Sequence, residues 1–306
     1  MPESSRQAPN PLTPTLSPPG RGRLAAHRYR LGLFFLFLLL AIPAAAQPTP
    51  FPAGTVEIAY GADARQRLDF TPAARPGAPL VVFIHGGAWS MGDMAMAGHM
   101  AVHFHDKGDA FASLDYRLVP EANPQQQAED VAAAIARLLE DARRLGIDRD
   151  RVMIMGHSAG AHLAALVGTD PAYLGAHHIP ISAIKGVVLL DGAGYDVAAQ
   201  IRFAGPLLRS MYHRAFGDDP AFQARVSPIA QAAAPNAGRF LIFHIASRAD
   251  SGAQSVRLGA VLTAAGTPAE VVSVDNTHSE IFRQFGQPGH RATALTDAFA
   301  EALFRR

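Results

Sequence analysis

The stretch of residues 151–166 constrains the fold of this chain more than any other. Four apolar residues, Val152–Met155, form a run that is short and continuous enough to be a fully buried strand. A G-x-S-x-G sequence at residues 156–160 follows at once, and an Ala- and Leu-rich run that favours a helix comes next. A buried strand that turns sharply into a helix is typical of a mostly parallel α/β sheet.

The residues of this turn are typical of a turn that exposes a nucleophilic serine. Between a strand and a helix, a G-x-S-x-G sequence holds its serine, here Ser158, on a tight turn with the hydroxyl exposed. Such a turn is strained and brings strand and helix close together, so Gly156 and Gly160 remove side chains that would collide. The helix also directs its free N–H groups at the same place. A serine that only caps an ordinary helix is the alternative.

Length and composition limit what surrounds this turn. The chain has 306 residues, no cysteine, 49% hydrophobic residues and a formal net charge of +1. The near-neutral charge gives no reason to expect nucleic acid as a partner. The lack of cysteine excludes disulfides and thiolate zinc sites. Without an N-terminal export segment, the chain has the size of one large α/β domain, and its oligomeric state is left open.

Residues 1–46 are expected to be a disordered leader followed by a signal peptide. Arg28 and Arg30 precede the apolar run Leu31–Ile42, and an A-x-A cleavage site ends at Ala46. The apolar run is short for a bilayer span. We therefore expect export to the periplasm or the medium, with no stable membrane anchor after cleavage. A retained anchor is the alternative.

The rest of the chain alternates strand and helix patterns. A Pro-rich lead-in at residues 47–54 precedes a domain at residues 55–306, for which we expect a mostly parallel eight-stranded sheet with helices on both faces. Residues 192–238 are too long for a plain connection and rich in spaced apolar residues, so we expect a small helical cap there. The expected strands are residues 55–60, 66–70, 80–84, 110–114, 152–155, 184–190, 240–245 and 269–274, and helices are expected at residues 94–107, 125–145, 253–265 and 291–304, besides the one after Ser158.

Glycines and polar residues follow several of these strands. The His85-Gly86-Gly87 sequence, Ser158, Asp191, Asp250 and His278 all come shortly after an expected strand. Because ligands bind at the carboxyl ends of parallel strands, these residues can converge on one rim of the sheet.

Taken together, the ordered motifs resemble the α/β-hydrolase esterase and lipase family, in particular its hormone-sensitive-lipase-like, feruloyl-esterase-like and kynurenine-formamidase-like members. The resemblance covers about residues 55–304 and rests on residues 85–89, 115–118 and 156–164 together with the late Asp and His. It implies an α/β-hydrolase fold, a carboxylesterase-type enzyme without cofactor or metal, and a small-molecule ester as substrate.

The resemblance also implies a catalytic triad. Ser158 becomes the nucleophile, His278 the general base and Asp250 the acid that orients it, in the chain order that this fold uses. The position of His278 after the last expected strand agrees with this role. Asp191 is the alternative acid because it too follows a buried strand.

An oxyanion hole requires two backbone N–H donors near the serine. We expect one from Ala159 and the other from the loop Gly86-Gly87-Ala88, where relatives often carry a third glycine in place of Ala88. Trp89 follows this loop and is expected to line the substrate pocket or to pack the loop.

Other polar residues are interpreted as structural. His157 is expected to pack beside the turn, and His162 lies on the helix that follows. Residues 115–117 resemble a structural motif of the family. His99 and His103 have i,i+4 spacing but lack the glutamate of an H-E-x-x-H site, so no metal site is predicted.

The chain is therefore predicted to be an exported serine hydrolase that acts on a carboxylic ester through an acyl-enzyme. Hydrolysis of a small amide, as in formamidases, is the alternative within enzymes. A non-catalytic binding protein on the same fold is the alternative of another class.

Overall fold

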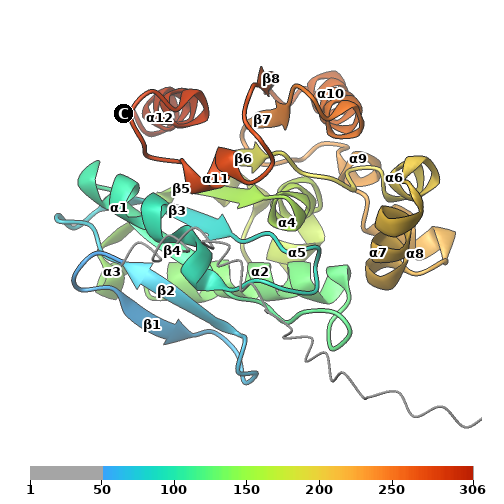
Figure 1. Cartoon of the computed structure of the whole chain (residues 1–306). Helices are drawn as coiled ribbons and strands as arrows, with labels where there is room; N and C mark the ends of the chain where they lie inside the picture. The colour runs from blue at the N-terminus through green and yellow to red at the C-terminus, as the bar shows by residue number, and fades with distance from the viewer. Residues whose placement is uncertain (1–50, 306) are drawn as a thin grey trace, which may run out of the picture. The chain divides into compact units, whose positions relative to one another are not determined.

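The structure is a computed structural model that describes residues 51–305 (Figure 1). The expected leader and signal peptide at residues 1–46 lie outside the described residues. Among the described residues, no helix is long and apolar enough to cross a membrane.

A single twisted sheet of eight strands carries the described part of the chain, in the order β1-β2-β4-β3-β5-β6-β7-β8. β1 and β2 form an antiparallel hairpin, β2 is antiparallel to β4, and every other pair is parallel. This confirms the expected mostly parallel sheet. The strands are β1 Val56–Ala59, β2 Arg67–Thr71, β3 Ala78–Ile84, β4 Ala110–Leu114, β5 Ile147–His157, β6 Ile184–Leu190, β7 Phe240–Ile245 and β8 Ala269–Val274.

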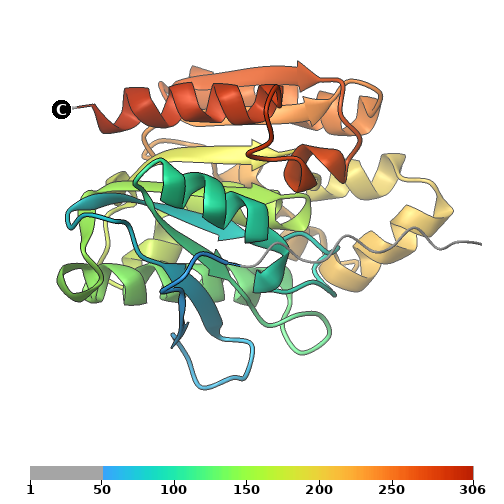
Figure 2. The ribbon, with the colours of Figure 1, turned by 60° about the vertical axis from the view of Figure 1, so that its left-hand side comes forward.

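Apolar side chains of successive strand residues point to opposite faces, and each face is covered by helices (Figures 1 and 2). In β3, Val82 belongs to the cluster under α2 (Pro124–Glu140), α4 (Ala159–Thr169) and α10 (Ala249–Ala264). Its neighbours Val81 and Phe83 belong to the cluster under α1 (Gly98–Asp106) and α12 (Arg291–Phe304). Because both faces are buried, the central strands are apolar almost throughout.

Four elements differ most from the expectation, and the first is β5, which was expected at residues 152–155 and runs from Ile147 to His157. The single helix expected at residues 125–145 is two helices, α2 and α3, that meet at Asp141 before left-handed Gly146 ends the second. The helix expected at residues 94–107 starts with a 3₁₀ turn, η1. α10 begins four residues earlier than expected, at Ala249, so that Asp250 lies in its first turn. The short helical elements are η1 Met94–Ala97, α3 Ala142–Leu145, α5 Pro171–Gly175, η2 Ile181–Ala183 and α11 Glu280–Arg283.

The segment of residues 192–238 forms the expected cap of helices, which Figure 1 shows in yellow and light orange beside the ends of the central strands. Asp196 and Asp219 accept hydrogen bonds from the first backbone N–H groups of α6 and α8, so each begins a helix. The cap helices are α6 Val197–Phe203, α7 Pro206–Phe216, α8 Pro220–Arg225 and α9 Pro228–Gln231.

Candidate active site

Ser158 sits on the turn between β5 and α4 with φ 55° and ψ −118°, a conformation that is uncommon for a residue with a side chain. A Cβ atom on Gly156 would lie 2.2 Å from the carbonyl oxygen of Gly160, and one on Gly160 would lie 2.1 Å from that of Ile84. Both distances are far below van der Waals contact. The turn therefore closes only with glycine on either side of Ser158, as the sequence predicted.

Ser158, His278 and Asp191 lie in a hydrogen-bonded row. The Oγ atom of Ser158 is 3.0 Å from Nε2 of His278, and Nδ1 of His278 is 2.6 Å from Oδ2 of Asp191. The sheet register explains the contact, because His157 on β5 pairs with Leu190 on β6. Ser158 and Asp191 each follow one of these paired residues, and His278 reaches both from the loop after β8.

Asp191 is fully buried but surrounded by hydrogen-bond donors. Its Oδ1 accepts from the backbone N–H of Ile245 at 3.1 Å and from the hydroxyl of Ser251 at 2.5 Å, and its Oδ2 accepts from His278 and from Nη1 of Arg248. Burial alone would raise the pKa of Asp191. The hydrogen bonds from His278 and Ser251 and the positive charge of Arg248 outweigh it and hold the pKa well below its usual value. Asp191 is therefore a carboxylate at neutral pH.

The structure corrects the expected partner of His278 from Asp250 to Asp191. Asp250 has a side chain that is 39% exposed, and its Oδ2 accepts from Nε2 of Gln200 at 3.2 Å and lies 3.6 Å from Nη2 of Arg248. The early start of α10 is the physical reason, because it directs Asp250 towards cap helix α6. Asp191, in contrast, follows the strand next to the one that carries Ser158.

The loop after β3 lies against the Ser158 turn, where an oxyanion hole was expected. A Cβ atom on Gly86 would lie 2.8 Å from Nδ1 of buried His157 and 3.1 Å from Cβ of Ser158, so a side chain at residue 86 would crowd the turn. The carbonyl oxygen of Gly87 accepts two backbone N–H groups at 3.0 Å, which closes the loop. Ala88 has φ 52°, which explains why a glycine is favoured at this position. Ala159 is the first residue of α4, so its N–H has no acceptor within the helix.

Tyr116 contacts His85 at the start of this loop, in agreement with the structural interpretation of residues 115–117. The hydroxyl of Tyr116 donates to the carbonyl oxygen of His85 at 2.9 Å, and the two rings stack with centroids 4.3 Å apart. Arg117 donates to both carboxylate oxygens of Asp130. Asp115 accepts from Arg65 at 3.0 Å. Tyr116 thus bonds to the backbone of the loop, and Asp115 and Arg117 form ion pairs with Arg65 and Asp130.

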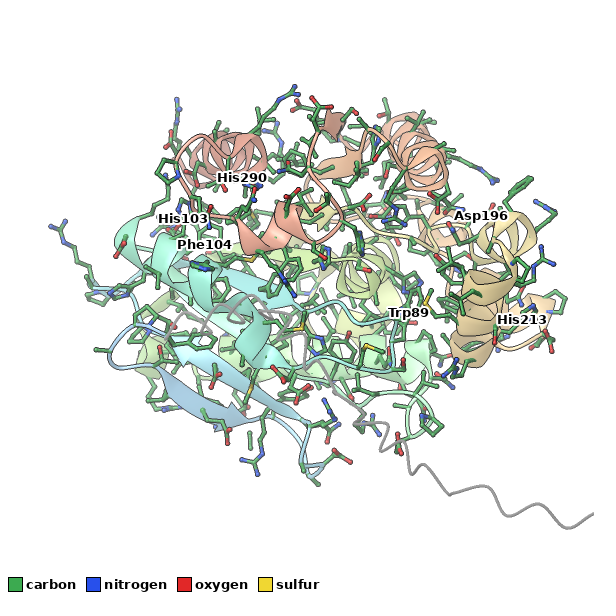
Figure 3. All side chains as sticks on the ribbon, viewed as in Figure 1. Trp89, His103, Phe104, Asp196, His213 and His290 are labelled. Carbon is green, nitrogen blue, oxygen red and sulfur yellow. The ribbon has the colours of Figure 1, made fainter. Side chains whose placement is uncertain are left out.

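Trp89 packs the loop, which is the second of its two expected roles. It is 2% exposed, and its Nε1 donates to Nδ1 of His162 at 3.2 Å. Its ring contacts Tyr212 and Phe216 of cap helix α7, and Figure 3 shows it at the boundary between the sheet domain and the cap. Nε2 of His162 then donates to the carbonyl oxygen of Val226 at 2.7 Å, so His162 is structural, as expected.

His157 has a larger part in the site than the sequence indicated. Its Nε2 donates to the backbone oxygen of His278 at 2.7 Å, and its ring lies 4.6 Å from the ring of His278 and 4.3 Å from that of Phe282. Burial, with a contribution from neighbouring His278, lowers the pKa of His157 to about 3. A neutral imidazole therefore supports the loop that carries His278. Its position before the serine was the available signal, but nothing in the sequence showed that the loop of His278 packs there.

Arg248 and Ser251 were also missed by the sequence analysis, although both contact Asp191. Arg248 and Ser251, like Asp250, follow β7 in the sequence. Which of these side chains points towards His278 depends on the backbone conformation at the start of α10.

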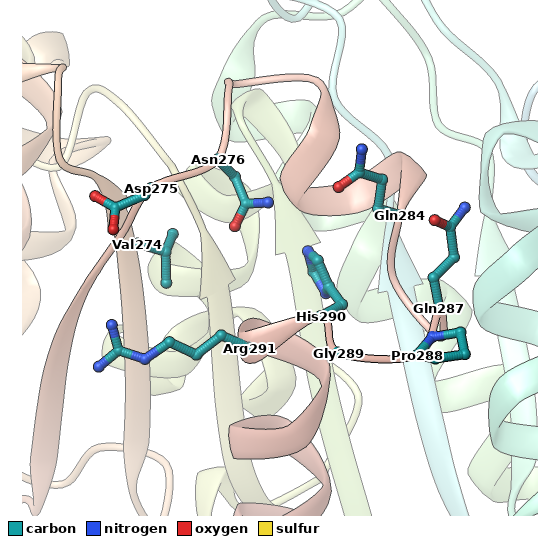
Figure 4. Close-up of a pocket in the computed structure, with 9 residues that line it drawn as sticks. All are labelled: Val274, Asp275, Asn276, Gln284, Gln287, Pro288, Gly289, His290 and Arg291. Atoms are coloured by element: carbon teal, nitrogen blue, oxygen red, sulfur yellow. The ribbon is translucent and has the colours of Figure 1, made fainter.

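His103 and a pocket near α12 both lie apart from the row of Ser158, His278 and Asp191. His103 is paired with Asp297 at 2.8 Å, and within residues 51–305 no group of three or more His, Cys, Asp or Glu side chains is arranged for a metal ion. A polar pocket of about 290 Å³ lies between the end of β8 and the start of α12 (Figure 4). Its lining includes Asn276 and His290 but none of Ser158, Asp191 and His278.

The fold and this row of residues define the chain as an α/β-hydrolase, and comparisons with known proteins agree. The family model BD-FAE matches residues 69–178. Esterase LipC of Mycobacterium tuberculosis is 30% identical over 200 residues, which cover 61% of this chain and 49% of that protein. The isoprenylcysteine alpha-carbonyl methylesterase ICME of Arabidopsis thaliana is 29% identical over 244 residues, which cover 74% and 57%. The chain thus spans about half the length of these relatives.

Solved structures with the same fold include two esterases. Esterase 2 of Thermogutta terrifontis superposes with a TM-score of 0.70 at 20% identity, over 84% of this chain and 98% of that one. Esterase B of Lactobacillus rhamnosis gives a TM-score of 0.68 at 20% identity, over 83% and 87%. The chain therefore has the α/β-hydrolase fold of these esterases.

Proposed function

We propose that this protein is a serine hydrolase that cleaves a small carboxylic ester through an acyl-enzyme. The observation that carries the proposal is the row from Ser158 through His278 to Asp191, with 3.0 Å and 2.6 Å between the atoms that would share protons. Asp191 takes the part of the triad acid that the sequence analysis gave to Asp250. The esterase names of the sequence relatives support an ester rather than an amide as substrate.

In the first half of the reaction, Nε2 of His278 accepts the hydroxyl proton of Ser158 while Oγ attacks the ester carbonyl carbon. The carboxylate of Asp191 holds the imidazole in the tautomer with a proton on Nδ1 and stabilises the imidazolium that forms. Because Asp191 stays charged at neutral pH, it serves this purpose without taking up a proton.

The negative charge that develops on the former carbonyl oxygen is stabilised by hydrogen-bond donors that are positioned before the reaction begins. The N–H of Ala159 and an N–H of the loop Gly86-Gly87-Ala88 supply them, assisted by the positive end of α4. His278 then returns the proton to the leaving alcohol. In the second half, a water molecule takes the place of the alcohol, His278 activates it in the same way, and the acid product leaves Ser158.

Covalent labelling tests this proposal directly. Esterase 2 of Thermogutta terrifontis has been captured phosphonylated by sarin. We expect a fluorophosphonate probe to add once to this protein, with the adduct on the peptide that contains Ser158 and none in Ser158→Ala. Emission from Trp89, the single tryptophan, checks that the variant is folded. Wild-type protein that stays unlabelled, and that hydrolyses no p-nitrophenyl ester, would overturn the proposal.

We further infer that the protein is exported, since the basic, apolar and A-x-A segments of residues 28–46 have the order of a signal peptide. N-terminal sequencing of protein from the periplasm or the medium is expected to start after Ala46. Exported protein that still carries residues 1–30 would contradict the inference.

A further inference from the structure

Arg248 lies within hydrogen-bond distance of both the base and the acid of the proposed triad. Its Nη1 donates to Oδ2 of Asp191 and also lies 2.8 Å from Nδ1 of His278. The same Nδ1 is 2.6 Å from Oδ2 of Asp191. Three polar atoms of three residues are therefore within hydrogen-bond distance of one another.

Not all three of these contacts are favourable at once. A guanidinium nitrogen only donates, and a carboxylate oxygen only accepts. When Nδ1 of His278 carries the proton that general-base catalysis requires, it donates to Asp191, and Nη1 and Nδ1 become two donors side by side. When Nδ1 is unprotonated, it accepts from Arg248, but the proton then sits on Nε2 and blocks uptake of the Ser158 proton. In either case, the position of Arg248 hinders His278 from acting as the general base.

The repulsion between Arg248 and His278 increases during the reaction. Proton transfer from Ser158 makes His278 an imidazolium, and the positive charge of Arg248 is then adjacent to a second positive charge. Asp191 does not depend on Arg248 to be satisfied, because Ile245, Ser251 and His278 also donate to it. Moving the guanidinium away would therefore strengthen the base without leaving the acid unpaired.

On the side of the cap, Arg248 has a second carboxylate within reach, that of Asp250. Nη2 of Arg248 lies 3.6 Å from Oδ2 of Asp250, and Asp250 accepts a hydrogen bond from Gln200 of cap helix α6. Asp250 and Gln200 both line a cleft of about 410 Å³ between α6 and α10. The surface of this cleft is mostly apolar and includes the ring of Phe203, which is 79% exposed. A continuous polar chain thus joins the cleft to His278.

We propose that this cleft binds an apolar acyl chain of the substrate and that Arg248 is a positioning residue that couples its occupancy to the triad. The inference rests on the proposed ester hydrolysis. An acyl chain that enters between α6 and α10 displaces Gln200 from Asp250. Asp250 then draws the guanidinium of Arg248 away from His278, which frees the base. Short acyl groups leave the cleft empty and the base restrained.

The experiment compares kcat for p-nitrophenyl octanoate and p-nitrophenyl acetate, because the acyl chain stays on the enzyme through both halves of the reaction. Wild type, Arg248→Gln, Asp250→Asn and Arg257→Gln are measured. Arg257 is the matched control, since it lines the same cleft but pairs with Asp196 and not with the triad. Folding of each variant is checked by Trp89 emission.

We expect Arg248→Gln to raise kcat for the acetate several-fold, so that the ratio of the octanoate to the acetate rate falls towards one. Asp250→Asn is expected to lower kcat for the octanoate several-fold and kcat for the acetate less, so that the ratio again falls. Arg257→Gln is expected to keep the wild-type ratio, with a change confined to KM.

Ester turnover that depends on Ser158, but whose ratio is the same in wild type and Arg248→Gln, would overturn this inference alone. An equal loss for both esters in Arg248→Gln would do the same, because Arg248 would then only support Asp191. Absence of any Ser158-dependent turnover in the wild type would overturn the proposed function together with it.

Discussion

The ring of His157 donates a hydrogen bond to the backbone oxygen of His278 at 2.7 Å, although the two residues are 121 positions apart in the chain. The residue before the candidate nucleophile thus fastens the loop of the candidate base. With Nε2 of His278 only 3.0 Å from Ser158, a small displacement of this loop breaks the alignment on which proton transfer depends.

We therefore expect His157→Phe to lower kcat by about five-fold, the effect of losing a hydrogen bond worth about 1 kcal/mol. The aromatic ring still packs on Phe282, so KM and the folded state are expected to change little. Steady-state kinetics on one p-nitrophenyl ester measure both constants. His162→Phe is the control: it removes a buried histidine four residues later that does not touch His278, and kcat is expected to stay near the wild-type value. Unchanged kcat in folded His157→Phe would contradict the prediction.

Asp191→Asn is expected to lower kcat by about 10⁴-fold, because an amide cannot hold His278 in the required tautomer or balance the imidazolium charge. Asp250→Asn is expected to lose less than about 10-fold, since Asp250 faces Gln200 and Arg248. The two substitutions are chemically identical, so each controls for the other. A collapse of turnover in Asp250→Asn with near-normal Asp191→Asn would return the acid to the position that the family resemblance implied.

The sequence was sufficient for the sheet and for Ser158 and His278 of the proposed triad. Apolar runs such as Val152–Met155 mark buried strands, and only glycine fits beside Ser158, so both features can be read without coordinates. The acid could not be read in this way. Asp191 and Asp250 both follow buried strands, and the choice depends on where α10 begins and on β6 being the neighbour of β5. Such facts of three-dimensional packing leave no local pattern in the sequence.

Trp89 illustrates the same limit. Its position after a glycine-rich loop left two roles open, a substrate contact or packing of the loop, and only the structure shows that Nε1 pairs with His162 and that α7 of the cap packs on the ring. The partners lie far along the chain, and no periodicity connects them with Trp89.

Gly160→Ala is expected to destabilise the protein by about 3 kcal/mol or more, because the new methyl group would overlap the carbonyl oxygens of Ile84 and His85 at 2.1 and 2.5 Å. Gly175→Ala in α5 is the matched control, since a Cβ atom there meets nothing within 4 Å and alanine favours a helix. Urea unfolding followed by Trp89 emission measures both. Equal stability of the two variants would show that strand and helix are not in contact at Gly160.

Two buried histidines are expected to make the free energy of unfolding fall as the pH drops below 6.5. Burial lowers the pKa of His157 to about 3 and that of His162 to about 4, from a value of 6.5 in the unfolded chain. Between these values, the unfolded chain binds a proton that the folded protein excludes. Stability is therefore complete above pH 6.5 and is lost on acidification towards pH 4, by up to about 1.4 kcal/mol per pH unit for each histidine.

Other groups modify this slope but do not reverse it. Burial also lowers the pKa of His290, which adds to the effect, whereas it raises the pKa of Asp109 to about 6, which opposes it below that pH. Asp191 has a lowered pKa, but its contribution is lost only below the usual range of a carboxyl group.

A single substitution isolates the contribution of His162 to the pH dependence of the free energy of unfolding. In His162→Gln, the amide oxygen can still accept from Trp89 and the amide nitrogen can still donate to Val226, but the side chain no longer titrates. Urea unfolding at pH 7, 6 and 5 is expected to give a shallower loss of stability for this variant than for wild type, by about 1 kcal/mol per pH unit below pH 6. The comparison cancels the contributions of Asp109, His157 and His290, which both proteins share. If the two proteins lose stability in parallel, folded His162 takes up a proton as readily as the unfolded chain, and burial does not lower its pKa.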